Sequence, residues 1–227
     1  MKIFIATPAM NGMFYSNYFI SALATQAGCT KDGHDVMFYT LSAESLIPRA
    51  RNKCAMAFVE SGFDKLMFID ADIGWKYEDL KLLMESDKKI IGGTYAIKQF
   101  PIRMNFNPLM PHYEVFGRDR SMEAYKKFVE TYADPNGEVE VRHLPTGFMM
   151  IDRSVIETLC RTESIYVSPK GAELIESIDL FPSGVVGSRY ESEDWGFCRI
   201  AREMGIPSHL QTRIICSHMG NMIYKED

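Results

Sequence analysis

The residues best suited to chemistry begin with two aspartates, Asp70 and Asp72, separated by Ala71. They follow an apolar run, Lys65–Ile69, that predicts a buried strand. Ligands of open α/β sheets collect beyond the carboxyl ends of the strands, and carboxylates two residues apart share one face where the chain stays extended. Their oxygens suit Mg²⁺ or Mn²⁺, which also bind diphosphates. By itself the triplet is equally compatible with a helix-capping aspartate and a solvated one.

A second acidic pair, Glu193 and Asp194, follows Ser192 and opens a helix predicted over Asp194–Met204. One of these carboxylates has the chemistry of a general base for an acceptor hydroxyl. The alternative is structural, because acids at a helix N-terminus cap it and complement its dipole. The preceding Gly/Ser-rich segment Ser183–Arg189 is expected to be a loop suited to closing over a ligand.

Two further residues are candidates for the site. Gly147 lies between two predicted strands, and His218 follows the last predicted strand. Glycine lets a backbone approach a ligand closely, although Pro145–Phe148 also fits a plain β-turn. His218 follows a strand predicted over His209–Cys216; an imidazole at a strand end can bind a metal, although a lone histidine there is more often a surface residue.

The elements that position these residues alternate regularly up to Tyr95, which predicts a mostly parallel sheet with helices on both faces. The predicted strands are Lys2–Thr7, Asp35–Leu41, Lys65–Asp70 and Lys89–Tyr95, and the predicted helices are Tyr15–Gln26, Arg49–Glu60 and Tyr77–Ser86. Gly62 is expected to cap the second helix.

The alternation breaks after Tyr95, where prolines predict an extended loop over Ala96–Tyr113. The remaining predicted elements are a helix over Arg120–Tyr132, strands over Glu138–Leu144 and Phe148–Asp152, and a helix over Ser154–Arg161 capped by Ser154.

The region Lys98–Tyr132 is expected to build a wall for an acceptor. Its side chains either face that acceptor or form a small satellite core; they are Phe100, Arg103, Phe106, His112, Tyr113 and Phe116. The sequence shows no repeat or linker, which favours a single domain.

Composition narrows the function classes. A net charge of −5 argues against strong nonspecific binding to nucleic acid. No apolar run approaches the roughly 18 residues that cross a membrane, and the start of the chain has no signal-peptide pattern. The five cysteines have no CxxC spacing, which favours reduced thiols. We expect a protein without a membrane span in the cytoplasm, or in the host cytoplasm for a viral protein.

Taken in order, these marks resemble those of the GT-A glycosyltransferases, which carry a DxD motif, a glycine-containing loop, an xED motif and a C-terminal histidine. The match covers nearly the whole chain. The stretch Pro48–Asn52, followed by FIDADIGW at residues 68–75, is similar to small bacterial, phage and large-DNA-virus transferases. The resemblance implies one Rossmann-like GT-A domain over residues 1–227, with residues 1–95 as the nucleotide-binding half and 96–227 as the acceptor-binding half.

The resemblance also implies a metal site. Asp70, Asp72 and His218 would hold Mn²⁺ or Mg²⁺, with Asp72 bound most directly and Asp70 near the ribose or sugar of the donor. The DxD segment, including Ala71, and Arg51 would contact the nucleotide-sugar donor, for which UDP is the favoured nucleotide.

Further roles follow from the same resemblance. Thr7, Pro8 and Ala9 would contact the nucleotide base or ribose, and Gly147 would shape the acceptor side of the donor sugar. Asp194 would be the catalytic base and Glu193 would assist sugar binding. The expected reaction is an inverting single displacement onto a hydroxyl of a glycan, a small molecule or a modified DNA base.

Two other functions fit parts of the pattern. Sugar nucleotidylyltransferases use a Gly-rich, basic loop after the first strand, whereas TPAMNG here contains one glycine and no Arg or Lys. A non-catalytic sugar-nucleotide or glycan-binding module is expected to have lost at least one acidic residue of these motifs, and none is missing.

Overall fold

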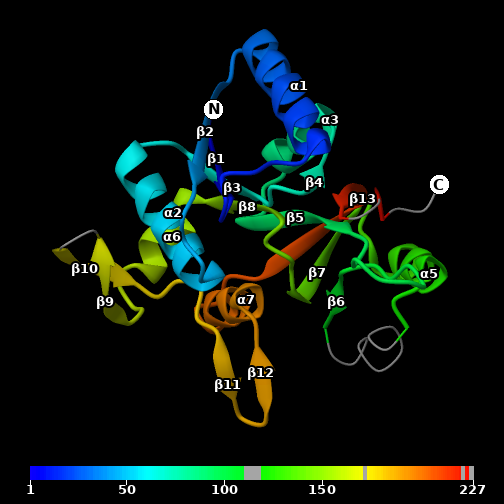
Figure 1. Cartoon of the computed structure of the whole chain (residues 1–227). Coiled ribbons are helices and arrows are strands. Elements are labelled where there is room, and N and C mark those ends of the chain that lie inside the picture. Colours follow the sequence, from blue (N-terminus) through cyan, green and yellow to red (C-terminus); the bar gives the residue numbers. More distant parts are fainter. Residues whose placement is uncertain (110–118, 171–172, 221–222, 225–227) are drawn as a thin grey trace.

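The computed structural model describes residues 1–109, 119–170, 173–220 and 223–224 (Figure 1). Its centre is a mixed sheet with strand order β2-β1-β3-β8-β5-β13-β7-β6. These strands are β1 (Lys2–Pro8), β2 (Asp35–Leu41), β3 (Lys65–Ile69), β5 (Ile90–Tyr95), β6 (Asn107–Pro108), β7 (Glu138–His143), β8 (Phe148–Asp152) and β13 (Ser208–Met219). The short strands β4 (Ile73–Gly74) and β14 (Ile223–Tyr224) pair with the end of β13.

The sheet is mostly parallel in direction, as predicted. β1 pairs in parallel with both β2 and β3, and β13 pairs in parallel with β5. β8 runs antiparallel between β3 and β5, so those two strands point the same way without touching. A strand of the predicted acceptor-binding half is thereby inserted between two strands of the nucleotide-binding half, and the chain forms a single α/β domain.

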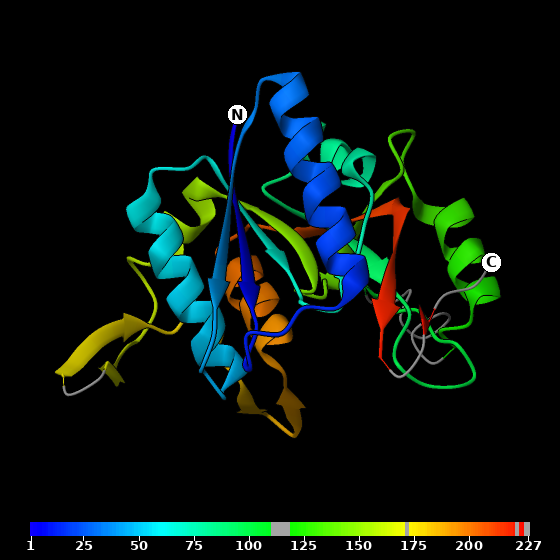
Figure 2. The same cartoon turned by 45° about the horizontal axis from the view of Figure 1, so that its top comes forward.

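Helices cover both faces of the sheet because side chains alternate along the central strands. Ile3 and Ile5 of β1 pack with α1 (Ser16–Asp32) and α3 (Tyr77–Glu85). Phe4 and Ala6 face the opposite core, which contains α2 (Ile47–Ser61), α6 (Arg153–Leu159) and α7 (Glu193–Glu203). Figure 2 shows α1 and α2 flanking the same end of the sheet.

The helix ends agree with the sequence in part. Gly62 caps α2 with a φ of 70°, as predicted. The predicted Ser154 cap is wrong, because the carboxylate of Asp152 accepts the hydrogen bond from the Ser154 backbone N–H and α6 begins at Arg153.

Two hairpins differ from expectation. The predicted Gly/Ser-rich loop is a hairpin of β11 (Gly184–Val186) and β12 (Arg189–Glu191), which leads directly into α7. A second hairpin, β9 (Ile165–Lys170) with β10 (Glu173–Ile178), has no counterpart among the predicted elements. Both stand out from the body of the molecule (Figure 1).

The region after β5 contributes to the core. Phe106 is 1% exposed and packs against Tyr125 and Phe128 of α5 (Met122–Tyr132), as the satellite-core interpretation predicts. Phe100, by contrast, is 67% exposed. Three other aromatic candidates lie outside the described residues; they are His112, Tyr113 and Phe116.

Two further features concern membrane spans and cysteines. No helix in the described part of the chain has the length and apolar character needed to span a bilayer. All five cysteines are free thiols.

Candidate functional site

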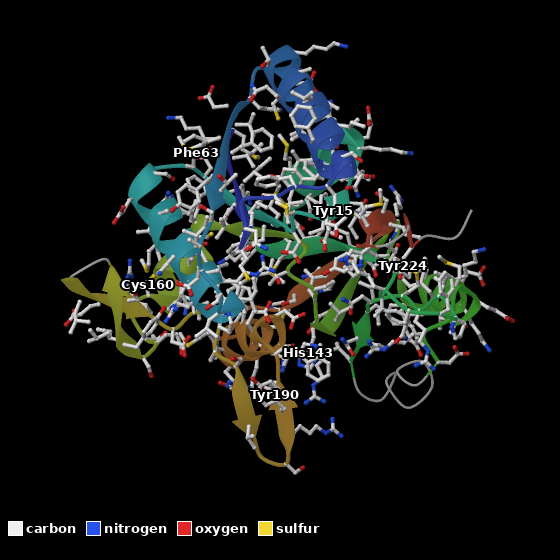
Figure 3. All side chains as sticks on the ribbon, in the orientation of Figure 1. Tyr15, Phe63, His143, Cys160, Tyr190 and Tyr224 are labelled. Atoms are coloured by element: carbon white, nitrogen blue, oxygen red, sulfur yellow. The ribbon has the colours of Figure 1, made fainter. Side chains whose placement is uncertain are left out.

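A cleft of about 340 Å³ opens at the carboxyl ends of β1 and β3. It brings together residues from four separate segments: Pro8, Ala9, Met10, Asn11, Met13, Tyr15, Ile47, Arg51, Asp70, Ala71, Asp72 and Glu193. Figure 3 labels Tyr15, which lies where the chain enters α1. Larger hollows of about 590 to 720 Å³ lie elsewhere on the described surface, but no predicted site residue lines them. The cleft is therefore the better candidate despite its smaller volume.

Arg51 of α2 is the buried cation of this cleft, with a side chain only 2% exposed. Its Nη2 donates to Asp70 Oδ1 at 2.7 Å, and its Nε lies 3.7 Å from Glu193 Oε1. The guanidinium also stacks over the Phe68 ring, 5.0 Å from the centroid. Nε and Nη1 are buried and have no hydrogen-bond partner among the described residues. Because buried donors are normally satisfied, these two nitrogens leave hydrogen-bonding capacity unused beside the cleft.

The two aspartates of the DxD segment do not share a face. The chain turns after β3, where the Ile73 backbone N–H donates to the Asp70 carbonyl at 3.0 Å. Asp70 therefore points toward Arg51, whereas Asp72 contacts Lys98 and lies 3.6 Å from His218 Nε2. The condition for two carboxylates on one face, an extended chain through Asp72, is not met because β3 ends at Ile69.

Asp72 is held as a carboxylate by its neighbours. Burial alone would raise its pKa, but the contacts with His218 and Lys98 outweigh burial and leave the pKa below the ordinary value. Asp72 is thus charged throughout the neutral pH range and suited to a cation.

His218 is oriented by a backbone carbonyl. Its Nδ1 donates to the Ala96 oxygen at 2.7 Å, since a carbonyl only accepts, and this leaves Nε2 directed toward Asp72. Pairing of β13 with β4 places His218 opposite Ile73, next to the DxD turn. A histidine that donates its second ring N–H to a carbonyl is the arrangement typical of metal-binding histidines.

The fit of this pair to a divalent cation can be judged from the geometry. Asp72 Oδ1 and His218 Nε2 lie 3.6 Å apart, so this carboxylate and imidazole are the two side chains that would hold a divalent cation here. Asp70 is instead engaged by Arg51. Across the described residues, no group of three or more His, Cys, Asp or Glu side chains is gathered to hold a metal. Within the described residues, a divalent cation would therefore have Asp72 and His218 as its side-chain ligands, and a diphosphate and water would have to complete the coordination.

Thr7 and Gly147 lie beneath the cleft rather than in its lining. Thr7 belongs to β1, is fully buried and shares a 2.7 Å hydrogen bond with the Tyr18 hydroxyl, so its side chain does not face a ligand. The Gly147 carbonyl accepts from the Asp70 backbone N–H at 3.1 Å. A Cβ at Gly147 would stand 2.4 Å from the Tyr95 hydroxyl oxygen, so the glycine allows Tyr95 to cross the floor of the site.

The acidic pair begins α7 as predicted. Glu193 lines the cleft, and Asp194 is fixed through Oδ1, which accepts from the Ser192 hydroxyl and from the Trp195 N–H. Burial raises the pKa of Asp194, and it also raises the pKa of Glu193 although Arg51 opposes that shift. A raised carboxyl pKa brings a general base closer to neutral pH.

Three residues at this site were not found from the sequence. Tyr95 lies at the end of β5, and its ring meets the His218 ring edge-on at 4.9 Å; its place at a strand end could have identified it. Asn52 belongs to the stretch that carries the resemblance but was given no role; its Oδ1 accepts from the backbone N–H groups of Leu180 and Phe181 and anchors the segment before the β11–β12 hairpin. Lys98 begins the region predicted as the acceptor wall and was not predicted to contact Asp72.

Comparison with known proteins adds little. No protein-family model and no curated protein matches the sequence. Among solved structures, this chain is similar to a glycosyltransferase involved in glycosylation of the major capsid of PBCV-1, with 10% identity and a TM-score of 0.35. That match covers 70% of this chain and 63% of the other, so the chain spans less than two thirds of that protein.

A second structure has the same level of similarity. It is a putative glucose-1-phosphate thymidylyltransferase from Bacillus anthracis in complex with a sucrose, with 10% identity, a TM-score of 0.35, and coverage of 72% of this chain and 76% of the other. Similarity this distant does not indicate which reaction the present chain catalyses. That question rests on its own site residues.

Proposed function

We propose that this protein is a metal-dependent glycosyltransferase that moves a sugar from a nucleotide diphosphate donor, with a UDP-sugar favoured, to an acceptor hydroxyl. The observation that carries the proposal is that one cleft is lined both by the buried Arg51, with two guanidinium nitrogens that lack a hydrogen-bond partner, and by Asp72, whose carboxylate lies 3.6 Å from His218 Nε2. A diphosphate is an anion of the size and charge that both groups can bind at once.

The donor would lie along the cleft from base to sugar. Pro8 and Ala9 offer the apolar wall against which the nucleoside would rest, and Ala71 continues that wall toward the DxD turn. Arg51 would donate its free N–H groups to the donor, with its charge held in place by Asp70. Glu193, which lies beside the Arg51 guanidinium, would accept hydrogen bonds from sugar hydroxyls.

Asp72 and His218 would hold Mn²⁺ or Mg²⁺. When bound, the ion supplies Lewis-acid stabilisation of the negative charge that develops on the departing diphosphate. The fixed Nδ1–H of His218 keeps its Nε2 lone pair directed at that position.

Asp194 would remove the proton of the acceptor hydroxyl. The hydroxyl oxygen then forms its bond to the anomeric carbon while the bond from that carbon to the diphosphate oxygen breaks, and the electron pair leaves with the nucleoside diphosphate. A single displacement of this kind inverts the anomeric configuration. Both hydrogen bonds that orient Asp194 go to Oδ1, so Oδ2 is the oxygen assigned to the proton.

The acceptor would be a glycan or small molecule bearing a hydroxyl group. A net charge of −5 opposes tight binding to the phosphate backbone of DNA, so a modified DNA base is the less favoured acceptor.

The test is release of free nucleoside diphosphate from a panel of nucleotide sugars in the presence of Mn²⁺, Mg²⁺ or EDTA. We expect slow, metal-dependent hydrolysis of one donor that Asp72→Ala abolishes. Asp32→Ala is the matched control, because Asp32 is similarly exposed, at 26% against 24%, and pairs with Lys81 away from the cleft. Metal-independent release, or full activity of Asp72→Ala, would refute the metal assignment. If no donor is hydrolysed and UDP and GDP with Mn²⁺ cause no thermal shift, the transferase proposal fails.

A further inference from the structure

Lys98 lies on the carboxylate that the proposed metal site requires. Its ammonium group contacts Asp72 Oδ2, on the opposite side of the carboxylate from the His218 contact at Oδ1. The side chain is 33% exposed, and its ammonium also lies 5.9 Å from the centroid of the Tyr15 ring. Asp72 is thus already neutralised by a cation that the protein itself supplies.

The position of Lys98 is built into the fold. The loop that carries it is closed by a 2.7 Å hydrogen bond from the Ile97 N–H to the Arg103 carbonyl. Its stem runs beside Gly220, where an added Cβ would approach the Lys98 Cδ to 3.3 Å. The base of the side chain is therefore placed close to Asp72, while the flexible stem leaves the ammonium free to turn.

Charge makes this arrangement unfavourable for a lone divalent cation. An ammonium and a divalent ion on the two oxygens of one carboxylate would be like charges only a few ångströms apart, and they repel each other in a partly buried site. An anion that joins them relieves this repulsion. A nucleoside diphosphate is such an anion, and Lys98 can bind its phosphates as a point charge.

We propose that Lys98 couples the binding of the divalent cation to the binding of the diphosphate. Without nucleotide, Lys98 occupies Asp72 and weakens cation binding. With nucleotide present, the ammonium turns from Asp72 to the diphosphate, so that cation and diphosphate bind together. This inference rests on the proposed function, because it assigns Lys98 to the same donor site.

The experiment measures Mn²⁺ binding to the intact chain with and without UDP, by calorimetry or by the electron paramagnetic resonance signal of free Mn²⁺. The variants are Lys98→Met, which removes the charge, and Lys98→Arg, which keeps it. Lys88→Met is the matched control, since Lys88 is 29% exposed and pairs with Asp87 at 2.8 Å near the opposite end of β5.

We expect Lys98→Met to bind Mn²⁺ alone about fivefold more tightly or better, the lower end of usual coupling between two sites. The same variant should bind UDP in the presence of Mn²⁺ more weakly than wild type. Because the affinity for Mn²⁺ alone rises and the affinity for UDP falls, the cooperativity between Mn²⁺ and UDP decreases. Lys98→Arg and Lys88→Met should behave as wild type.

The outcomes separate this inference from the proposed function. If the wild-type protein binds Mn²⁺ and UDP together but Lys98→Met has unchanged affinity for both, the coupling role of Lys98 is refuted and the metal-dependent transferase stands. If neither wild type nor any variant binds Mn²⁺, with or without UDP, both proposals fall. A general loss of stability would weaken all affinities alike, whereas we expect the two affinities to move in opposite directions.

Discussion

Arg51 Nη2 lies 2.7 Å from Asp70 Oδ1, and this bond joins a fully buried arginine to an aspartate that is one-third exposed at the cleft. Arg51 itself lines the cleft with Asp70. Its burial is compensated by Asp70 and, at 3.7 Å, by Glu193.

Replacing Arg51 by Met should therefore reduce both stability and donor binding. Two partly buried carboxylates would lose their counter-charge, which costs about 2 to 3 kcal/mol, less than for a fully buried pair because Asp70 is partly exposed. Urea unfolding and UDP binding measure the two effects. Arg49→Met is the control, because Arg49 is on the same helix and pairs with Glu44, which Lys53 also neutralises. Equal stability of the two variants would contradict the assigned role of Arg51.

Gly147→Ala should displace Tyr95. The new Cβ would stand 2.4 Å from the tyrosine oxygen and 2.8 Å from Cζ, so the ring must shift, and its edge-on contact with His218 would be disturbed. We expect a loss of about 1 to 3 kcal/mol of unfolding free energy, as for other overpacked sites, together with weaker Mn²⁺–UDP binding. Adding Tyr95→Phe removes the closest contact and should restore part of the stability. An alanine variant with unchanged stability and binding would show that the site tolerates a Cβ here.

Asp194→Asn should stabilise the protein at neutral pH while abolishing transfer. Burial raises the folded-state pKa of Asp194 above its ordinary value of 3.8, so the folded chain binds this proton more tightly than the unfolded chain. The stability that this proton provides is present at low pH and is lost as pH rises through the folded-state pKa. An asparagine keeps the acceptor oxygen for Ser192 and Trp195 without the buried charge.

Chemical unfolding of wild type and Asp194→Asn from pH 3.5 to pH 8 tests this. At pH 8 we expect the variant to be more stable by about 1 kcal/mol, a typical gain from relieving a destabilised functional site. The difference should disappear toward pH 3.8. A variant less stable than wild type at pH 8 would show that the charged carboxylate is not destabilising.

Asn52→Ala should loosen the segment that leads to the β11–β12 hairpin. The buried backbone N–H groups of Leu180 and Phe181 would lose their shared acceptor, which costs about 3 kcal/mol in total. Urea unfolding measures the loss. Asn136→Ala, in an exposed turn, should change stability by less than about 0.5 kcal/mol. A small effect at Asn52 would mean that water or rearranged backbone replaces the amide.

Much of the fold could be predicted because its signals are local. Apolar runs located β1, β2, β3 and β5, and periodic apolar residues located α2. The insertion of β8 between β3 and β5 was not predicted, because pairing between strands about 60 to 85 residues apart leaves no periodic pattern in either strand.

The candidate site divides in the same way. The sequence by itself determined that Asp70 and Asp72 follow a buried strand and that Glu193 stands at the start of a helix, because strand and helix boundaries depend on neighbouring residues. Only the tertiary structure decided their partners: Asp70 with Arg51, and Asp72 with Lys98 and His218. Those pairings depend on a turn at the end of β3 and on the placement of β13 against β4 and β5, which long-range packing sets.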